Sequence, residues 1–96
     1  MRESTIEQYL VERVKALGGE VRKVKWIGRR GAPDRIVMLP ENYGSKPREA
    51  EFMWVELKAP GQKPRPHQAR EHERMRALHQ TVVVIDSMER VDEVLA

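Results

Sequence analysis

The apolar residues of this 96-residue chain never run for more than four positions, and that limit restricts its fold more than any other feature. The three longest runs are Ile36–Leu39, Phe52–Val55 and Val82–Ile85. Short runs rich in β-branched and aromatic residues, bounded by turn-forming residues, are typical of strands in a small sheet. The basic but β-rich segment 21–27 (VRKVKWI) predicts a further strand. A bilayer span needs roughly 18 apolar residues in succession, so we expect no membrane-spanning segment.

The N-terminal segment is predicted to be a helix. Apolar residues recur every three or four positions from Ile6 to Leu17, which is the spacing of one helix face. Ser4 and Glu7, three residues apart, have the pattern of a capping box at its start. The two glycines that follow Leu17 predict its end.

Two more helices complete the expected order of elements. Residues 67–79 (HQAREHERMRALH) predict a helix whose inward face carries Met75, Leu78, Ala69 and His72. Ser87 is placed to cap a last helix. The order is then αβββαβα, which predicts an α/β fold with a mixed four-stranded sheet flanked by helices. No linker or internal repeat divides the chain, so residues 1–96 are expected to form a single domain.

The composition excludes several classes of protein. There is no cysteine, which excludes disulfide bonds, thiolate zinc sites and cysteine nucleophiles. The first ten residues (MRESTIEQYL) lack the apolar stretch of a secretory signal peptide. A chain of this length buries only about 60–65% of its unfolded surface, so its core must be thin. We therefore expect a cytoplasmic protein in a reducing compartment.

Positive charge gathers in two segments. The net charge is +3, yet residues 21–35 carry a local +5 and residues 58–76 a local +4, whereas the other segments are negative. Twelve of the 18 basic residues are arginine, whose planar guanidinium suits phosphate oxygens. This pattern indicates a basic face for a polyanion, although a solvated, charge-rich surface explains it equally well. The candidate phosphate contacts are Arg22, Lys23, Lys25, Arg29, Arg30, Arg65, Arg70 and Arg74.

Acidic residues interrupt strands that should otherwise be apolar. Glu56 and Lys58 are two positions apart near the end of a predicted strand, so both side chains emerge on one face. Asp34 starts the preceding strand, and a hairpin between the two strands would bring Asp34 beside Glu56. Two carboxylates and an ammonium at one sheet edge match what Mg²⁺-assisted phosphoryl chemistry requires. Separately, a turn explains Asp34 and an exposed ion pair explains Glu56 with Lys58.

The same residues resemble a nuclease family. The runs Gly31-Ala32-Pro33-Asp34-Arg35 and Val55-Glu56-Leu57-Lys58, followed by Gln68 at the head of the next helix, are similar to the pattern of the VRR-NUC (virus-type replication-repair nuclease) domain. That domain is a compact branch of the PD-(D/E)XK nuclease superfamily. The resemblance covers nearly the whole chain and implies a PD-(D/E)XK nuclease-like core in the αβββαβα order predicted above.

The resemblance also implies roles for individual residues. Asp34 and Glu56 look like metal-binding carboxylates, with the backbone carbonyl of Leu57 as a further ligand. Lys58 looks like the catalytic lysine, and Gln68 is similar to the active-site glutamine of the family.

Glu7 is similar to the first-helix acid of the family, which approaches the metal. The capping box with Ser4 explains Glu7 without any catalysis, and the two explanations do not exclude each other. Related sequences carry a Ser or Thr cap before the proline that opens the helix of Gln68, whereas this chain has Arg65 before Pro66. No capping side chain is therefore predicted there, and Arg65 becomes a candidate phosphate contact.

The resemblance implies a Mg²⁺-dependent endonuclease that hydrolyses DNA phosphodiester bonds in replication, recombination or repair. It also implies a bacterial or phage-infected cell, with a phage as one expected source of the gene. Mn²⁺ is expected to replace Mg²⁺, and no small-molecule cofactor is expected. The absence of a base-reading helix favours selection of branched or junction DNA by shape. Stand-alone relatives are often homodimers, and Trp26-Ile27 beside the basic loop adds modest support for a dimer. The alternatives are a non-catalytic nucleic-acid-binding module and an accessory subunit activated by a partner.

Overall fold

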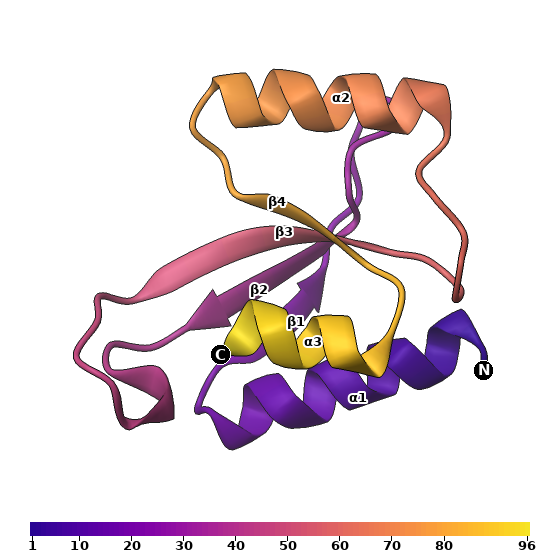
Figure 1. Cartoon of the computed structure of the whole chain (residues 1–96). Helices are drawn as coiled ribbons and strands as arrows, with labels where there is room; N and C mark the ends of the chain where they lie inside the picture. Colours follow the sequence, from indigo (N-terminus) through magenta and orange to yellow (C-terminus); the bar gives the residue numbers. More distant parts are fainter.

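Three helices surround a four-stranded sheet in the computed structural model, which describes all of residues 1–96 (Figure 1). A short 3-10 turn, η1, lies in the hairpin between the second and third strands. In chain order the elements are α1 (Glu3–Ala16), β1 (Glu20–Lys23), β2 (Arg35–Leu39), η1 (Tyr43–Ser45), β3 (Glu51–Leu57), α2 (Pro66–Ala77), β4 (Val82–Ile85) and α3 (Met88–Leu95).

The strands lie in the order β1-β2-β3-β4, with two antiparallel pairings followed by one parallel pairing between β3 and β4. A parallel pair needs a crossover, and α2 provides it. Arg35 of β2 pairs with Val55 of β3, and this is the last pair between those strands. One further step in the same register places Asp34 opposite Glu56.

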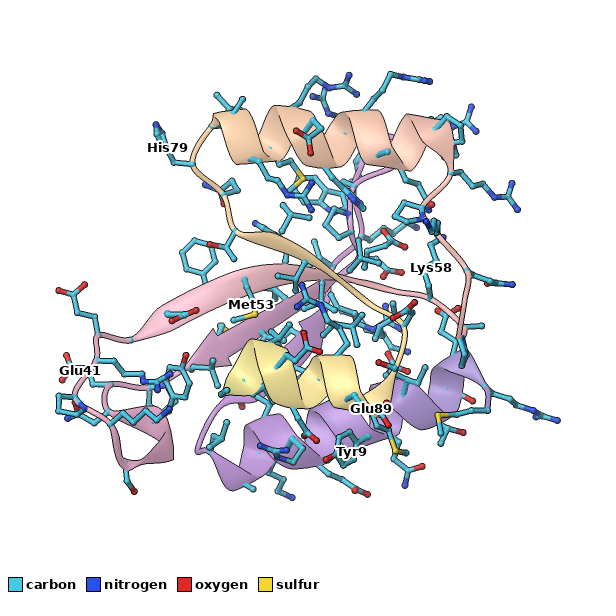
Figure 2. All side chains as sticks on the ribbon, viewed as in Figure 1. Tyr9, Glu41, Met53, Lys58, His79 and Glu89 are labelled. Atoms are coloured by element: carbon cyan, nitrogen blue, oxygen red, sulfur yellow. The ribbon has the colours of Figure 1, made fainter.

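The main core fills the space between the sheet and helices α1 and α3, which lie side by side on one face (Figure 1). Alternate residues of β2 and β3 point into it, as the two-residue period of a strand requires. Figure 2 shows Met53 between the sheet and this helical layer. The core residues are Ile6, Leu10, Val14, Val37, Leu39, Tyr43, Met53, Val55, Leu57, Ile85, Val91 and Leu95.

Helix α2 covers the opposite face of the sheet (Figure 1). The residues 24–34, between β1 and β2, leave the sheet and rise to α2, where the Trp26 ring packs 5.1 Å from that of Trp54. Gly31 lies so close to α2 that an added Cβ would sit 2.8 Å from the carbonyl oxygen of His67. Its φ of +85° also favours glycine. The loop is therefore fixed against the start of α2.

The predicted capping box is wrong. Helix α1 begins at Glu3 with Arg2 as its N-cap, and no side chain caps it, so Ser4 lies inside the first turn. Glu7 is free to bond elsewhere, and its carboxylate accepts from the Arg35 guanidinium. The cap predicted for α3 is confirmed, because Ser87 Oγ accepts from the backbone N–H of Arg90 at 3.0 Å.

Two boundaries also differ from the prediction. The strand expected over residues 21–27 ends at Lys23, because the chain turns away and Trp26 Nε1 instead donates to the Pro33 carbonyl at 2.8 Å. Helix α2 ends at Ala77, two residues before the predicted end, where His79 takes a left-handed φ of +65°. Leu78, predicted to face inward, is therefore 72% exposed, and the inward position predicted for Ala69 is also wrong, because its side chain is exposed. Met75 and His72 are buried as predicted.

None of the three helices combines the length and the apolar character needed to cross a membrane.

Candidate active site

The end of β3 carries the two side chains on which the site is built. Glu56 and Lys58 both point toward α2, and their side chains are only 11% and 14% exposed. Lys58 Nζ lies 3.8 Å from Glu56 Oε2. Figure 2 shows Lys58 just after the end of β3 and below α2. The prediction that strand alternation places these two residues on one face is confirmed.

Gln68 links Lys58 to the start of α2. Its Oε1 accepts a hydrogen bond from Lys58 Nζ at 2.8 Å and another from the backbone N–H of Arg65 at 2.9 Å. The second bond is the half of a capping box in which the third helical residue reaches back to the N-cap. Gln68 thus supplies the cap that Arg65 does not, and Pro66 occupies the first turn, where its missing N–H costs nothing.

Asp34 approaches the site from the neighbouring strand. Its side chain is 64% exposed, and its Oδ1 lies 2.9 Å from Arg35 Nη1. Arg35 also binds Glu7, so its guanidinium bridges Asp34 and the acid of α1. The sequence predicted Asp34 near Glu56 and Glu7 near a metal. The structure brings Asp34 to Glu56 along the strand register, whereas Glu7 is engaged by Arg35.

Burial raises the pKa of Glu56 from 4.5 to about 7. The positive charge of Lys58 opposes this shift, and the negative charges of Asp34 and Glu3 add to it. Glu3 was not predicted as a site residue. It lies in the first turn of α1, four residues before Glu7, so the spacing of acids on that helix was the one available signal.

His72 is the second residue that sequence reasoning did not assign to the site. It is 1% exposed, and its Nε2 lies 3.4 Å from Glu56 Oε1 without any hydrogen-bond partner. Burial lowers the pKa of His72, and the charges of Arg76 and Lys58 lower it further. The available signal was its position four residues after Gln68, which places both side chains on one face of α2.

The oxygen donors at this edge fit a hard divalent cation. No group of three or more His, Asp or Glu residues lies close enough together to hold a metal ion. Mg²⁺ commonly takes only one or two protein carboxylates and fills its shell with water and substrate phosphate. Burial is the main cause of the raised pKa of Glu56, and the negative charge of Asp34 adds to it. A cation between the two carboxylates would relieve their repulsion. The Leu57 carbonyl lies in the same stretch, beyond the last pair with β2.

The candidate phosphate contacts divide into paired and unpaired side chains. Arg29 and Arg74 both bind Glu71, at 2.9 Å and 2.7 Å, and lower its pKa. Each arginine remains about half exposed, so part of its guanidinium still faces solvent. Arg22 pairs with Glu20 on the surface. The exposed side chains without an ion pair are Lys23, Lys25, Arg30, Arg65 and Arg70.

Comparison with known proteins identifies the family, although no family model matches the chain. A solved structure described as a VRR_NUC domain is 42% identical in sequence and superimposes with a TM-score of 0.80. The match covers 96% of this chain and 91% of that one. The chain belongs to the VRR-NUC family of nucleases. The predicted family and the predicted fold are thereby confirmed.

A second relative, a curated protein, comes from a phage. "Putative nuclease p44" of Acyrthosiphon pisum secondary endosymbiont phage 1 is 45% identical over 89 residues, which are 93% of this chain and 87% of that protein. This VRR-NUC chain is accordingly a nuclease with a phage-associated homologue.

Proposed function

We propose that this VRR-NUC chain is a Mg²⁺-dependent endonuclease that hydrolyses DNA phosphodiester bonds, with Mn²⁺ able to replace Mg²⁺. The observation that carries the proposal is the arrangement at the end of β3. Lys58 is held by Gln68, and it lies beside the buried Glu56, which Asp34 faces from the next strand.

Asp34, Glu56 and the Leu57 carbonyl would hold the cation. When bound, Mg²⁺ lowers the pKa of water and neutralises charge that develops on phosphate. Lys58 then orients the attacking water or stabilises the negative charge of the transition state, because its ammonium is fixed in place by Gln68. Arg35 orients Asp34 by holding its Oδ1 at 2.9 Å.

The substrate is proposed to be branched or junction DNA in replication, recombination or repair. Backbone phosphates would bind the exposed basic residues around α2 and the 24–34 loop, which gives affinity without reading sequence. A homodimer would present two sites to such a substrate. The exposed apolar residues Ile27, Phe52 and Leu78 are the surface a second copy would cover.

The test compares cleavage of supercoiled, flapped, four-way and linear DNA, with Mg²⁺, with Mn²⁺ and with chelator. Asp34→Ala and Glu56→Ala are expected to abolish cleavage and to weaken Mn²⁺ binding in calorimetry, since each removes one of few protein ligands. Glu41→Ala is the matched control, because Glu41 is an exposed acid in the β2–β3 hairpin, at the opposite end of β3 from Lys58 (Figure 2). Unchanged Mn²⁺ affinity in both variants would contradict the assignment.

The same assay separates the alternatives. A non-catalytic binding module would bind DNA in every metal condition and cleave none. An accessory subunit would cleave only after addition of its partner.

A further inference from the structure

Gln68 and His72 face the two ends of one three-residue segment of β3. They are four residues apart on α2, which places them one above the other on the same helix face. Gln68 holds Lys58, and His72 faces Glu56. One turn of α2 therefore contacts both charged residues of the Glu56-Leu57-Lys58 run.

The Nε2 atom of His72 is the one buried side-chain nitrogen or oxygen that has no hydrogen-bond partner. A buried polar atom left unpaired costs free energy, so such an atom calls for an explanation. Its neighbour is Glu56 Oε1 at 3.4 Å, slightly beyond the normal range for a hydrogen bond. A small movement of either side chain closes that gap.

The two oxygens of Glu56 have separate neighbours. Oε1 faces His72, and Oε2 faces Lys58. A metal-bound carboxylate is ionised and can only accept hydrogen bonds, so the imidazole must be the donor. Partners of this kind, which bond to a metal ligand rather than to the metal, fix the orientation of the ligand.

We propose that His72 is a positioning residue whose Nε2–H bonds to Oε1 of Glu56 and so orients this carboxylate to bind the divalent cation. This inference rests on the proposed function of Glu56 as a metal ligand. It assigns His72 no contact with the cation or the DNA.

The test uses two substitutions of similar size. His72→Gln keeps an N–H donor at a similar reach, whereas His72→Met fills the same space without one. We expect His72→Met to weaken Mn²⁺ binding in calorimetry by about 10- to 100-fold and to lower kcat by a similar factor. KM for DNA should stay unchanged, and His72→Gln should stay within about threefold of wild type in every measurement.

A structural role alone would give a different result. If His72→Gln and His72→Met lose Mn²⁺ affinity equally, or if neither loses any, the proposal is wrong. Glu56→Gln separates this failure from that of the proposed function. If Glu56→Gln binds Mn²⁺ as tightly as wild type, both the proposed function of Glu56 and the role of His72 are wrong. If Glu56→Gln binds Mn²⁺ more weakly but His72→Met binds it as tightly as wild type, only the role of His72 is wrong.

A second measurement needs no variant and decides the matter if His72→Met does not fold. Long-range ¹H–¹⁵N correlation spectra of the wild-type chain report which imidazole nitrogen carries the proton. We expect the proton of His72 on Nε2 in the presence of Mg²⁺. A proton on Nδ1 alone would overturn the proposal.

Discussion

Glu56 is a carboxyl group with little access to water and with charged groups of both signs close by. Its pKa of about 7 in the folded chain, against 4.5 ordinarily, means that the folded chain retains a proton that the unfolded chain releases. Binding of a cation would favour the ionised form of Glu56, which burial disfavours.

The metal-free protein should lose stability as pH rises from about 4.5 to 7. Over that range the native state binds more protons than the unfolded state, so the free energy of unfolding falls by at most about 1.4 kcal/mol per pH unit. The stability that the protonated Glu56 contributes is fully present below 4.5, its pKa in the unfolded chain. It is lost as the pH rises through about 7, its pKa in the folded chain. Urea unfolding in chelator from about pH 5 to pH 8 measures the slope.

The pH dependence of the unfolding free energy is caused by Glu56 only if replacing this residue removes it. Glu56→Gln should do so, and Glu41→Gln, at an exposed position, should not. Identical curves for wild type and Glu56→Gln would show that the pKa of this carboxyl is ordinary.

Lys58→Met should separate chemistry from binding. Methionine keeps much of the side-chain volume but loses the charge, so DNA affinity should change little. Cleavage should fall roughly 100- to 1,000-fold, the effect of deleting one preorganised donor of about 2.7–4 kcal/mol. Single-turnover rates measure this, with exposed Lys63→Met as the control. Rates within about threefold of wild type would show that Lys58 is only a structural partner of Glu56 and Gln68.

At the scale of elements, the loop of residues 24–34 and the start of α2 depend on each other. Arg29 binds Glu71, and Gly31 lies so close to His67 that an added Cβ would collide with its carbonyl oxygen. Since Gln68 follows His67 directly, this contact positions the residue that holds Lys58.

Gly31→Ala should therefore reduce both stability and cleavage. Its positive φ costs about 1–2 kcal/mol for a residue with a Cβ, and the collision with the His67 carbonyl adds to that. Gly28→Ala is the matched control, because Gly28 has a similar φ but open space around its Cα. Equal losses of unfolding free energy in the two variants would show that the contact with α2 contributes nothing.

The elements that sequence predicted well are those set by local pattern. The proximity of Asp34 and Glu56 could be predicted from the sequence, because a hairpin and the two-residue period of side chains along a strand are enough to align them. Ser4 and Glu7 fit a local capping pattern too, but a partner distant in sequence, Arg35, takes the Glu7 carboxylate. Contacts of that kind, like that of His72 with Glu56, depend on how α1 and α2 pack, which no local spacing encodes.

On the scale of the whole molecule, the chain measures 37 × 32 × 20 Å and offers a single candidate site. One site cuts two strands only by release and rebinding, whereas a two-fold dimer presents two sites at once. The exposed Ile27, 92% accessible in the loop beside α2, is the most exposed large apolar side chain.

We expect a dimer in sedimentation equilibrium at micromolar concentration, with four-way DNA cleaved faster than linear duplex. Ile27→Ser should produce a monomer and remove that preference, because it takes apolar area from the proposed interface. Val11→Ser, on the exposed side of α1, should leave the dimer and the preference for four-way DNA unchanged. A wild-type monomer that nicks linear and four-way DNA equally well would exclude junction selectivity without touching the nuclease chemistry.

The double role of Gln68 Oε1 ties enzyme inactivation to the fraying of one helix end. When the first turn of α2 opens, the oxygen that holds Lys58 moves away with it, so each opened molecule is an inactive one. Helix ends open far more often than whole domains unfold. Activity should then decline on warming before the global transition, in step with hydrogen exchange at the Arg65 amide.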